Sequence, residues 1–478
     1  MSVIQNTDNF KDILFNNTSE VGKLTYKDIL DDTQKYMSEH NSKLFSDNNA
    51  TEEVQAQMRN AIESYVGKKG YVLPNTNTDQ LVTRLFNDMV KYSFLEDYLY
   101  RDGVEEININ AWDDIEVLER GQKPRRIEET FTSPQHAFDV VRRMLASHGI
   151  VIDNATPCVV GYLGEGVRIC CFKEPIVSER DGVAASIRIV KPNAVSKDKL
   201  LDFGTAREDE LDLLTLFINN GISVCAGGST GSGKTTTLSY LLSTIDQKKR
   251  LLSMEEGSRE FMLRKYNEDG TASNSVVSLL TRDSDNDKQR VSLQKLVELA
   301  MRMDPEIVAV GEMRSEEAYE VSEVARTGHT VVSTIHSMSA SATYRKMMTL
   351  AYKKYQMDTD FMMTLMVEAF PIIFFQKHLE DGSRKIVEVI EGISYENGEV
   401  QYQPLYRFVT LDKVKDANGN IIEIKGKHLK LNNPSKALQE RLLDSGVTRQ
   451  ELNHFLEIPT ENADKYKSYN ESKGESDV

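Results

Sequence analysis

The sequence has 478 residues, enough for two to four domains, because single hydrophobic cores usually stop growing well below that length. Acidic residues outnumber basic ones by 74 to 58, and this balance argues against a protein that coats nucleic acid through bulk charge. There is no C-x-x-C pair, so neither a disulfide framework nor a zinc ribbon is indicated, and we expect a cytoplasmic location. The four cysteines are Cys158, Cys170, Cys171 and Cys225.

Membrane-spanning segments are not predicted. No basic and apolar leader opens the sequence. The longest apolar-rich run, FPIIFFQ at residues 370–376, is far short of the roughly 20 residues that cross a bilayer. We therefore expect any association with the inner face of a membrane to be peripheral.

The amino-terminal part of the chain divides into three segments. Residues 1–75 are polar and charged, and helical stretches such as TEEVQAQMRNAIESYV predict a helical or mobile extension. Residues 76–192 mix strands such as VEEININ with the helix HAFDVVRRMLASHG, which predicts an α+β domain. Residues 193–208 contain proline, charge and glycine with little periodicity, and we expect them to form a linker.

The rest of the chain divides into three further segments. From residue 209 to about 410, strands and helices alternate, as in a sheet with helical crossovers. Residues 411–458 are expected to be a carboxyl-terminal extension. Residues 459–478 are polar and charged throughout, which predicts a disordered tail.

A phosphate-binding loop is the firmest prediction. Residues 228–235 read GSTGSGKT and match G-x-x-x-x-G-K-[ST], with an apolar strand before them and a helix after them. The glycines let the backbone N–H groups point inward, and the helix N-terminus adds partial positive charge. Lys234 would reach the β and γ phosphates, and the Thr235 hydroxyl would complete a Mg²⁺ shell. The predicted phosphate-binding residues are Gly228, Ser229, Thr230, Gly231, Ser232, Gly233, Lys234, Thr235 and Thr236.

Three later apolar strands each end in a residue capable of chemistry. The stretches are RLLSMEEG, EIVAVGEMR and TVVSTIHS. Carboxyl ends of parallel strands face one crevice, which would gather Glu255, Glu256, Glu312 and His336 at the γ phosphate. Such carboxylates can orient or deprotonate water and hold the hydration shell of Mg²⁺, and the histidine can sense the γ phosphate. Taken singly, each could instead be a solvated loop residue or a structural histidine, but their recurrence favours a catalytic set.

Other nucleotide-binding classes fit less well. Neither an N-K-x-D motif nor an L-S-G-G-Q signature is present, which disfavours a switch GTPase and an ABC transporter subunit. Nothing after the third strand suggests the acceptor site of a small-molecule kinase.

Together these motifs resemble the secretion-superfamily ATPases, nearest to the pilus-assembly branch called Tad or CpaF-like, with the conjugation-type VirB11 ATPases next. The family's Walker A, acidic, Walker B and histidine boxes resemble residues 228–235, 250–256, 307–312 and 328–336, the last including His329. The resemblance implies an α/β fold: a RecA-like P-loop ATPase core preceded by an α+β amino-terminal domain, here with a helical amino-terminal extension.

The resemblance also implies residue roles and partners. The family member would be a cytoplasmic, Mg²⁺-dependent ATPase in a homohexameric ring, acting with inner-membrane platform proteins in pilus assembly or macromolecule export. ATP would bind between two domains, with Thr235 and Glu312 serving Mg²⁺, the latter through water. The arginines expected to compensate phosphate charge are Arg168, Arg188, Arg302 and Arg314. Without the resemblance, Arg168 and Arg188 could equally be surface partners of carboxylates.

Two departures and two alternatives accompany the resemblance. Glu256 stands where the branch commonly has aspartate, and about 70 residues at each end lack a clear counterpart. We expect no structural zinc, because the cysteine spacing does not match the four-cysteine knob of extension-type relatives, and no strong nucleic-acid binding. A conjugative DNA-transfer ATPase and a nucleotide-gated scaffold with little turnover are the alternatives.

Overall fold

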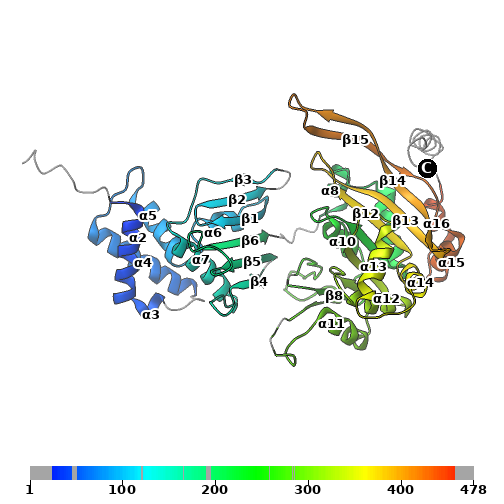
Figure 1. Cartoon of the computed structure of the whole chain (residues 1–478), viewed down its shortest axis with the longest axis horizontal. Helices are drawn as coiled ribbons and strands as arrows, with labels where there is room; N and C mark the ends of the chain where they lie inside the picture. Colours follow the sequence, from blue (N-terminus) through cyan, green and yellow to red (C-terminus); the bar gives the residue numbers. More distant parts are fainter. Residues whose placement is uncertain are drawn as a thin grey trace, which may run out of the picture. The chain divides into compact units, whose positions relative to one another are not determined.

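The computed structural model describes most of the chain and divides into two compact units. One comprises residues up to 163 together with 169–189, and the other comprises residues 164–168 and those from 190 onward (Figure 1). The expected tail at 459–478 and the first 23 residues of the expected extension lie outside the described residues. The described residues are 24–45, 51–119, 122–164, 166–189, 195–257, 259–282, 284 and 286–457.

The first unit opens with helices that bury an apolar cluster of their own. The expected helix over residues 51–66 is α4, and the four-residue spacing of Met58, Ile62 and Val66 places all three in this cluster. The helix ends at Gly70, whose φ of 68° provides a left-handed cap. These helices are α2 (Tyr26–His40), α3 (Ser42–Phe45), α4 (Glu52–Lys69) and α5 (Thr78–Met89).

A six-stranded sheet with the order β3-β2-β1-β6-β5-β4 forms the rest of the first unit. On β6 the side chains alternate, so that Ile187 and Ile189 are buried while Arg188 is exposed. Helix α7 packs against β6, and α6 packs against β1. The elements are α6 (Leu95–Tyr100), β1 (Val104–Ala111), β2 (Asp114–Glu119), β3 (Arg125–Arg126), α7 (Pro134–Ala146), β4 (Cys158–Tyr162), β5 (Val167–Lys173) and β6 (Val183–Ile189).

The second unit is built on a nine-stranded sheet with the order β15-β14-β13-β12-β7-β11-β10-β8-β9. The strands from β12 to β9 pair in parallel, and β7, β8 and β10 are buried at every position, which explains their continuous apolar sequences. The P-loop strand β7 lies between β12 and β11, the arrangement of a RecA-like core, so the predicted fold class is confirmed. The parallel strands are β7 (Val224–Gly228), β8 (Leu251–Glu255), β9 (Val276–Leu280), β10 (Ile307–Val310), β11 (Thr330–His336) and β12 (Ile372–His378).

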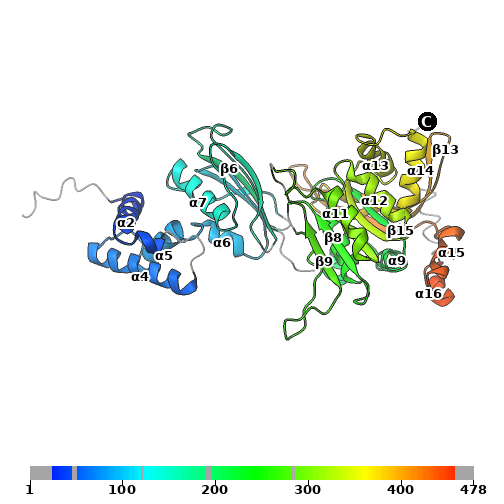
Figure 2. The same ribbon diagram turned by 90° about the horizontal axis from the view of Figure 1, so that it is seen from below.

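Helices cover both faces of this sheet (Figure 2). Val224 and Ala226 of β7 face one apolar cluster with residues of α9 and α10, whereas Cys225 faces the cluster formed with α11 to α14. Among the described residues, no helix is both long enough and apolar enough to span a bilayer. The helices are α8 (Lys197–Asp202), α9 (Glu208–Asn219), α10 (Lys234–Ser243), α11 (Leu293–Ala300), α12 (Glu317–Arg326), α13 (Ala342–Tyr352) and α14 (Thr359–Ala369).

Three antiparallel strands and two helices complete the second unit. Most of the span expected to be a carboxyl-terminal extension is part of this unit, because β15 pairs with β14 and both last helices bury residues in the core shared with α9 and α10. Glu391, 3% exposed, accepts hydrogen bonds from Gln403 Nε2 (2.8 Å) and from the backbone N–H of Ser435 (2.7 Å), the N-cap of α15. The elements are β13 (Arg384–Glu396), β14 (Glu399–Lys415), β15 (Ile421–Lys430), α15 (Lys436–Asp444) and α16 (Arg449–His454).

The described part of the expected linker also lies on the second unit. Helix α8 starts after the N-cap Ser196 and buries Leu200. Farther along, the carbonyl of Thr205 accepts a hydrogen bond from the backbone N–H of Ile386 on β13 (2.7 Å). Residues 195–208 are therefore packed against the sheet.

Glu391 is predicted to hold the last two helices onto the sheet. The substitution Glu391→Ala leaves a partly buried backbone N–H without its acceptor, so we expect a loss of about 1 to 3 kcal/mol in the free energy of unfolding. Hydrogen exchange of the α15 and α16 amides should accelerate. The exposed Glu399 offers a matched control, since Glu399→Ala should change neither quantity. Unchanged exchange in Glu391→Ala would contradict this role.

Candidate nucleotide site

The P-loop joins the end of β7 to the start of α10. Gly231 and Gly233 have φ values of 71° and 92°, a left-handed conformation that L side chains rarely adopt. At Gly228, a Cβ atom would lie 2.2 Å from the backbone oxygen of Gln376 on β12. The three loop glycines are therefore required by backbone conformation and by the close approach of the neighbouring strand.

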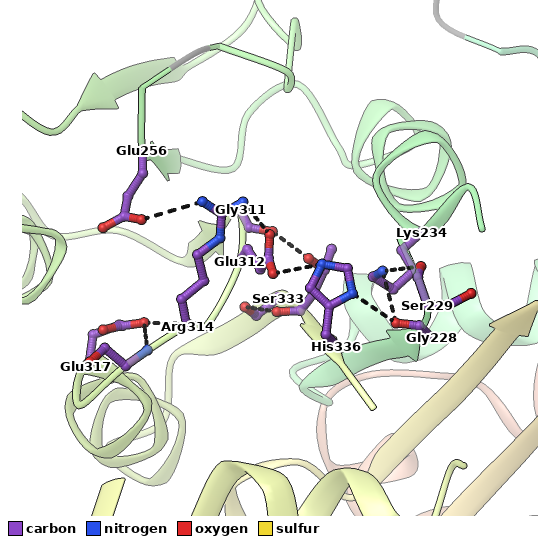
Figure 3. Close-up of polar contacts among 12 residues, drawn as sticks. Gly228, Ser229, Lys234, Glu256, Gly311, Glu312, Arg314, Glu317, Ser333 and His336 are labelled. Atoms are coloured by element: carbon purple, nitrogen blue, oxygen red, sulfur yellow. Dashed lines mark hydrogen bonds and ion pairs between the residues drawn. The ribbon is translucent and has the colours of Figure 1, made fainter. Parts of the chain in front are cut away.

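Lys234 is buried in this loop (Figure 3). Its ammonium donates hydrogen bonds to the backbone carbonyls of Gly228 (3.1 Å) and Ser229 (2.9 Å). The Ser232 hydroxyl also donates to the Ser229 carbonyl (2.8 Å). Phosphate oxygens carry negative charge and are stronger hydrogen-bond acceptors than carbonyls. The Lys234 ammonium is therefore placed where it can replace its contacts with these carbonyls by contacts with a bound phosphate.

His336, the last residue of β11, lies between Glu312, which follows β10, and the P-loop (Figure 3). Its Nε2 lies 3.1 Å from Oε1 of Glu312, and its Nδ1 lies 3.2 Å from the Gly228 carbonyl oxygen. Both neighbours of the ring are hydrogen-bond acceptors. The structure thus brings the predicted pair together at the loop.

Arg314 lies on the other side of Glu312. Its Nη2 donates to Oε2 of Glu312 (2.7 Å), and its Nη1 lies 3.9 Å from a carboxylate oxygen of Glu256. The hydrogen bond to Glu312 raises the pKa of Arg314. Arg314 therefore compensates the charge of these carboxylates and orients Glu312.

Glu317 fixes the turn that carries Arg314. Its Oε1 accepts hydrogen bonds from the backbone N–H groups of Arg314 (2.6 Å) and Ser315 (2.7 Å) at the start of α12. Sequence reasoning missed this residue. The available signal was an acidic side chain in the first turn of a helix, where it can satisfy unpaired backbone donors.

The acidic pair at the end of β8 divides into a buried and a half-exposed carboxyl group. Glu255 is 3% exposed, and its Oε1 accepts from the backbone N–H groups of Glu260 (2.7 Å) and Phe261 (3.0 Å). Its Oε2 is buried without a protein partner, and burial raises the pKa of Glu255 to about 7. Burial, followed by the charge of Glu317, also raises the pKa of Glu256. Both carboxyl groups are thus destabilised as anions.

These side chains surround one small cavity beside the P-loop. Its hydroxyl and carboxylate oxygens are the ligand type that Mg²⁺ prefers, so the donor set fits this ion. Thr235 and Glu312 could hold Mg²⁺ together with phosphate oxygens. The segment 164–168, which ends at Arg168, belongs to the second unit. The lining residues are Arg168, Thr235, Glu255, Glu256, Glu260, Gly311, Glu312 and Arg314.

Two predicted site residues of the second unit, Arg302 and His329, lie away from both the P-loop and the cavity. Arg302 is exposed on the 3-10 helix Met301–Met303. His329 directly precedes β11, so the length of that strand, roughly 20 Å, separates it from His336. Arg188 is exposed on β6 in the first unit.

Two residues that sequence reasoning missed contact the P-loop. The Gln376 side chain, 1% exposed, accepts a hydrogen bond from the Thr237 hydroxyl (2.9 Å). Nε of Arg384 donates to the carbonyl of Gly231 (2.9 Å). The available signal was Gln376 itself, a polar residue at the end of an apolar strand like those that carry Glu255, Glu312 and His336.

Comparisons with known proteins match the part of the chain that contains this site. Residues 173–370 match the family model described as Type II/IV secretion system protein. Over 317 residues the chain is 27% identical to an uncharacterized protein of Methanocaldococcus jannaschii, covering 66% of this chain and 55% of that protein. The chain thus spans about half the length of this relative.

A second relative and a solved structure are also similar. Over 251 residues the chain is 28% identical to the conjugal transfer protein TrbB of Rhizobium radiobacter, covering 52% of this chain and 72% of TrbB. The X-ray structure of the ATPase DotB of Legionella pneumophila is 17% identical with a TM-score of 0.44, covering 78% of this chain and 90% of DotB.

The buried carboxyl of Glu255 predicts a pH-dependent stability. A folded-state pKa of about 7, above the ordinary 4.5, means that the folded protein holds the proton more tightly, so stability falls as pH rises between these values. Glu255→Gln removes this titration. From pH 5 to pH 8 the free energy of unfolding of the variant should gain about 2 kcal/mol relative to the unsubstituted protein.

Urea unfolding at both pH values measures this difference. Glu399→Gln, at an exposed position, should show no such trend. A difference between Glu255→Gln and the unsubstituted protein that stays constant with pH would show that Glu255 is ionised throughout.

Proposed function

We propose that the chain is a Mg²⁺-dependent ATPase of the type II/IV secretion superfamily, a motor that uses ATP hydrolysis to drive pilus assembly or macromolecule export. The observation that carries the proposal is the link Glu312–His336–Gly228, which connects a carboxylate beside the cavity to the phosphate-binding loop. A loop that only held nucleotide would need no such connection. The match of residues 173–370 to the Type II/IV secretion system family supports a role in secretion or pilus assembly.

The proposed reaction assigns a task to each group around the cavity. Backbone N–H groups of the P-loop and Lys234 bind the β and γ phosphates. Bound Mg²⁺ would neutralise developing phosphate charge, and Thr235 is the residue placed to hold it. Glu312 orients the attacking water and accepts its proton. Arg314 keeps Glu312 in place through their 2.7 Å hydrogen bond.

His336 would report the state of the phosphate. Its ring bridges Glu312 and the Gly228 carbonyl, and a γ phosphate offers a charged acceptor in the same region. When the ring turns to that acceptor, Glu312 is released toward water. Phosphate release restores the original contacts, so the loop and the carboxylate are reset together.

The machine and its assembly are also part of the proposal. We place the protein in the cytoplasm, on the inner face of the membrane, as a homohexamer that acts with membrane platform proteins, nearest to the Tad or CpaF-like branch. Hydrolysis in successive subunits would drive domain movements of the ring. Arg168 and Arg188 would compensate phosphate charge within that assembly.

DNA transfer is the second candidate, because one relative is a conjugal transfer protein. Binding of single- or double-stranded DNA with a steep salt dependence would favour it. The net charge of −16 favours export or pilus assembly instead.

Steady-state phosphate release tests the enzymatic proposal. Glu312→Gln should lower kcat by at least about 100-fold while ATP still binds, since the water loses its base but the loop is intact. Lys234→Ala should abolish both binding and turnover. Glu298→Gln on the exposed side of α11 is a matched control with the same chemical change and should retain full activity. A wild-type protein that binds ATP without turnover, alone and with membrane partners, would leave a nucleotide-gated scaffold.

Light scattering with ATP and Mg²⁺ tests the ring. We expect the mass of six chains, because the resemblance to the secretion-superfamily ATPases implies a closed homohexameric ring. A mass of one chain at micromolar concentration, with nucleotide bound, would contradict the hexamer.

A further inference from the structure

The first residue of β13 contacts the phosphate-binding loop from outside the catalytic cavity. Arg384 donates from Nε to the Gly231 carbonyl, at 2.9 Å. A Cβ on Gly233 would lie 3.2 Å from Cδ of Arg384, so this side chain lies directly against the loop. Arg384 is half-buried and places positive charge beside the segment that binds phosphate.

The hairpin that carries Arg384 is held firmly on both sides. On β12, the backbone of Gln376 pairs with Gly228 of β7, and its side chain accepts a hydrogen bond from the Thr237 hydroxyl. In the turn before Arg384, the Asp381 carboxylate accepts hydrogen bonds from the backbone N–H groups of Ser383 (3.0 Å) and Ile424 (2.8 Å). These contacts of the hairpin place Arg384 against the phosphate-binding loop.

The second residue of β13 contacts a different segment. Lys385 donates from Nζ to the Phe203 carbonyl (2.9 Å), and the next residue, Ile386, donates its N–H to Thr205. Between them, the Gly204 carbonyl lies 3.3 Å from Nε2 of His428 on β15. Residues 203–205 belong to the stretch through which the chain enters the second unit.

We infer that Arg384 is a positioning residue for the nucleotide-binding loop, and that with Lys385 it connects this loop to the entering segment 203–205. The inference rests on the proposed nucleotide binding. Successive side chains of a strand point to opposite faces, so two adjacent residues can hold two separate segments. When phosphate binding moves Gly231, Arg384 transmits the movement to the start of β13, and Lys385 transmits it to residues 203–205.

ADP binding and hydrogen exchange test this connection without requiring turnover. In the unsubstituted protein, ADP with Mg²⁺ should slow exchange at residues 229–236 and at 203–206. Arg384→Gln should raise the Kd for ADP roughly tenfold, the size expected for losing a charge-assisted hydrogen bond at the loop. In the Arg384→Gln variant, saturating ADP should still slow hydrogen exchange at residues 229–236 but should no longer slow it at residues 203–206. Arg384→Lys, which keeps a charged donor, should recover most of the affinity.

Lys385→Met separates the two contacts. It keeps the aliphatic length and removes the donor, so the Kd for ADP should stay within about twofold while the protection of 203–206 is lost. Matched controls are Arg326→Gln on α12 and Lys295→Met on α11, which remove exposed ion pairs and should change neither quantity. Thermal unfolding confirms that each variant is folded.

The outcomes distinguish this inference from the proposed function. An unsubstituted protein that does not bind ADP would overturn both. Normal ADP binding by the unsubstituted protein together with an unchanged Kd in Arg384→Gln, or retained protection of 203–206 in Lys385→Met, would overturn this inference alone.

Discussion

The carbonyl oxygen of Gly228 is the point on which the proposed chemistry of the second unit depends. This oxygen accepts a hydrogen bond from the Lys234 ammonium, and it lies 3.2 Å from Nδ1 of His336. Lys234, which would bind phosphate, and His336, which reaches Glu312, therefore share one acceptor. Two strands converge there, because Gly228 pairs with His336 on one side and with Gln376 on the other. A side chain at position 228 would collide with β12, so only glycine allows this convergence.

Burial and charge compensation differ between the two carboxyl groups Glu255 and Glu312. Glu255 lies at the end of a fully buried strand, and its pKa rises because few groups offset the lost hydration. Glu312 is better compensated, with Arg314 and His336 on its two oxygens. The two carboxyl groups therefore meet different surroundings although they line the same cavity.

Much of this site could be predicted from the sequence because it follows from local patterns. The glycine spacing of residues 228–235 and the polar residues that end β8, β10 and β11 were sufficient to gather Glu255, Glu312 and His336. Contacts between distant segments were not predictable, since nothing local shows that Arg384 reaches Gly231. His329 was predicted at the site because it belongs to the histidine motif, but it precedes β11 whereas His336 ends this strand. Membership of a motif does not reveal which end of a strand a residue occupies. Similarly, low periodicity in the expected linker concealed that residues 195–208 pack on the sheet. The lack of a clear counterpart for the carboxyl-terminal end concealed that residues 411–457 belong to the same unit.

The pairing of β14 with β13 and β15 has a practical consequence for dividing the gene into fragments. A fragment ending at residue 410, where the recognisable motifs fade, would cut β14 before its last five residues and remove β15 entirely. The apolar surface that Leu438, Leu442 and Leu452 cover would then face water, and β14 would become an unprotected sheet edge. Insolubility of such a fragment would report a damaged core and would reveal nothing about the catalytic competence of the motifs. Fragments for biochemistry should therefore extend beyond α16.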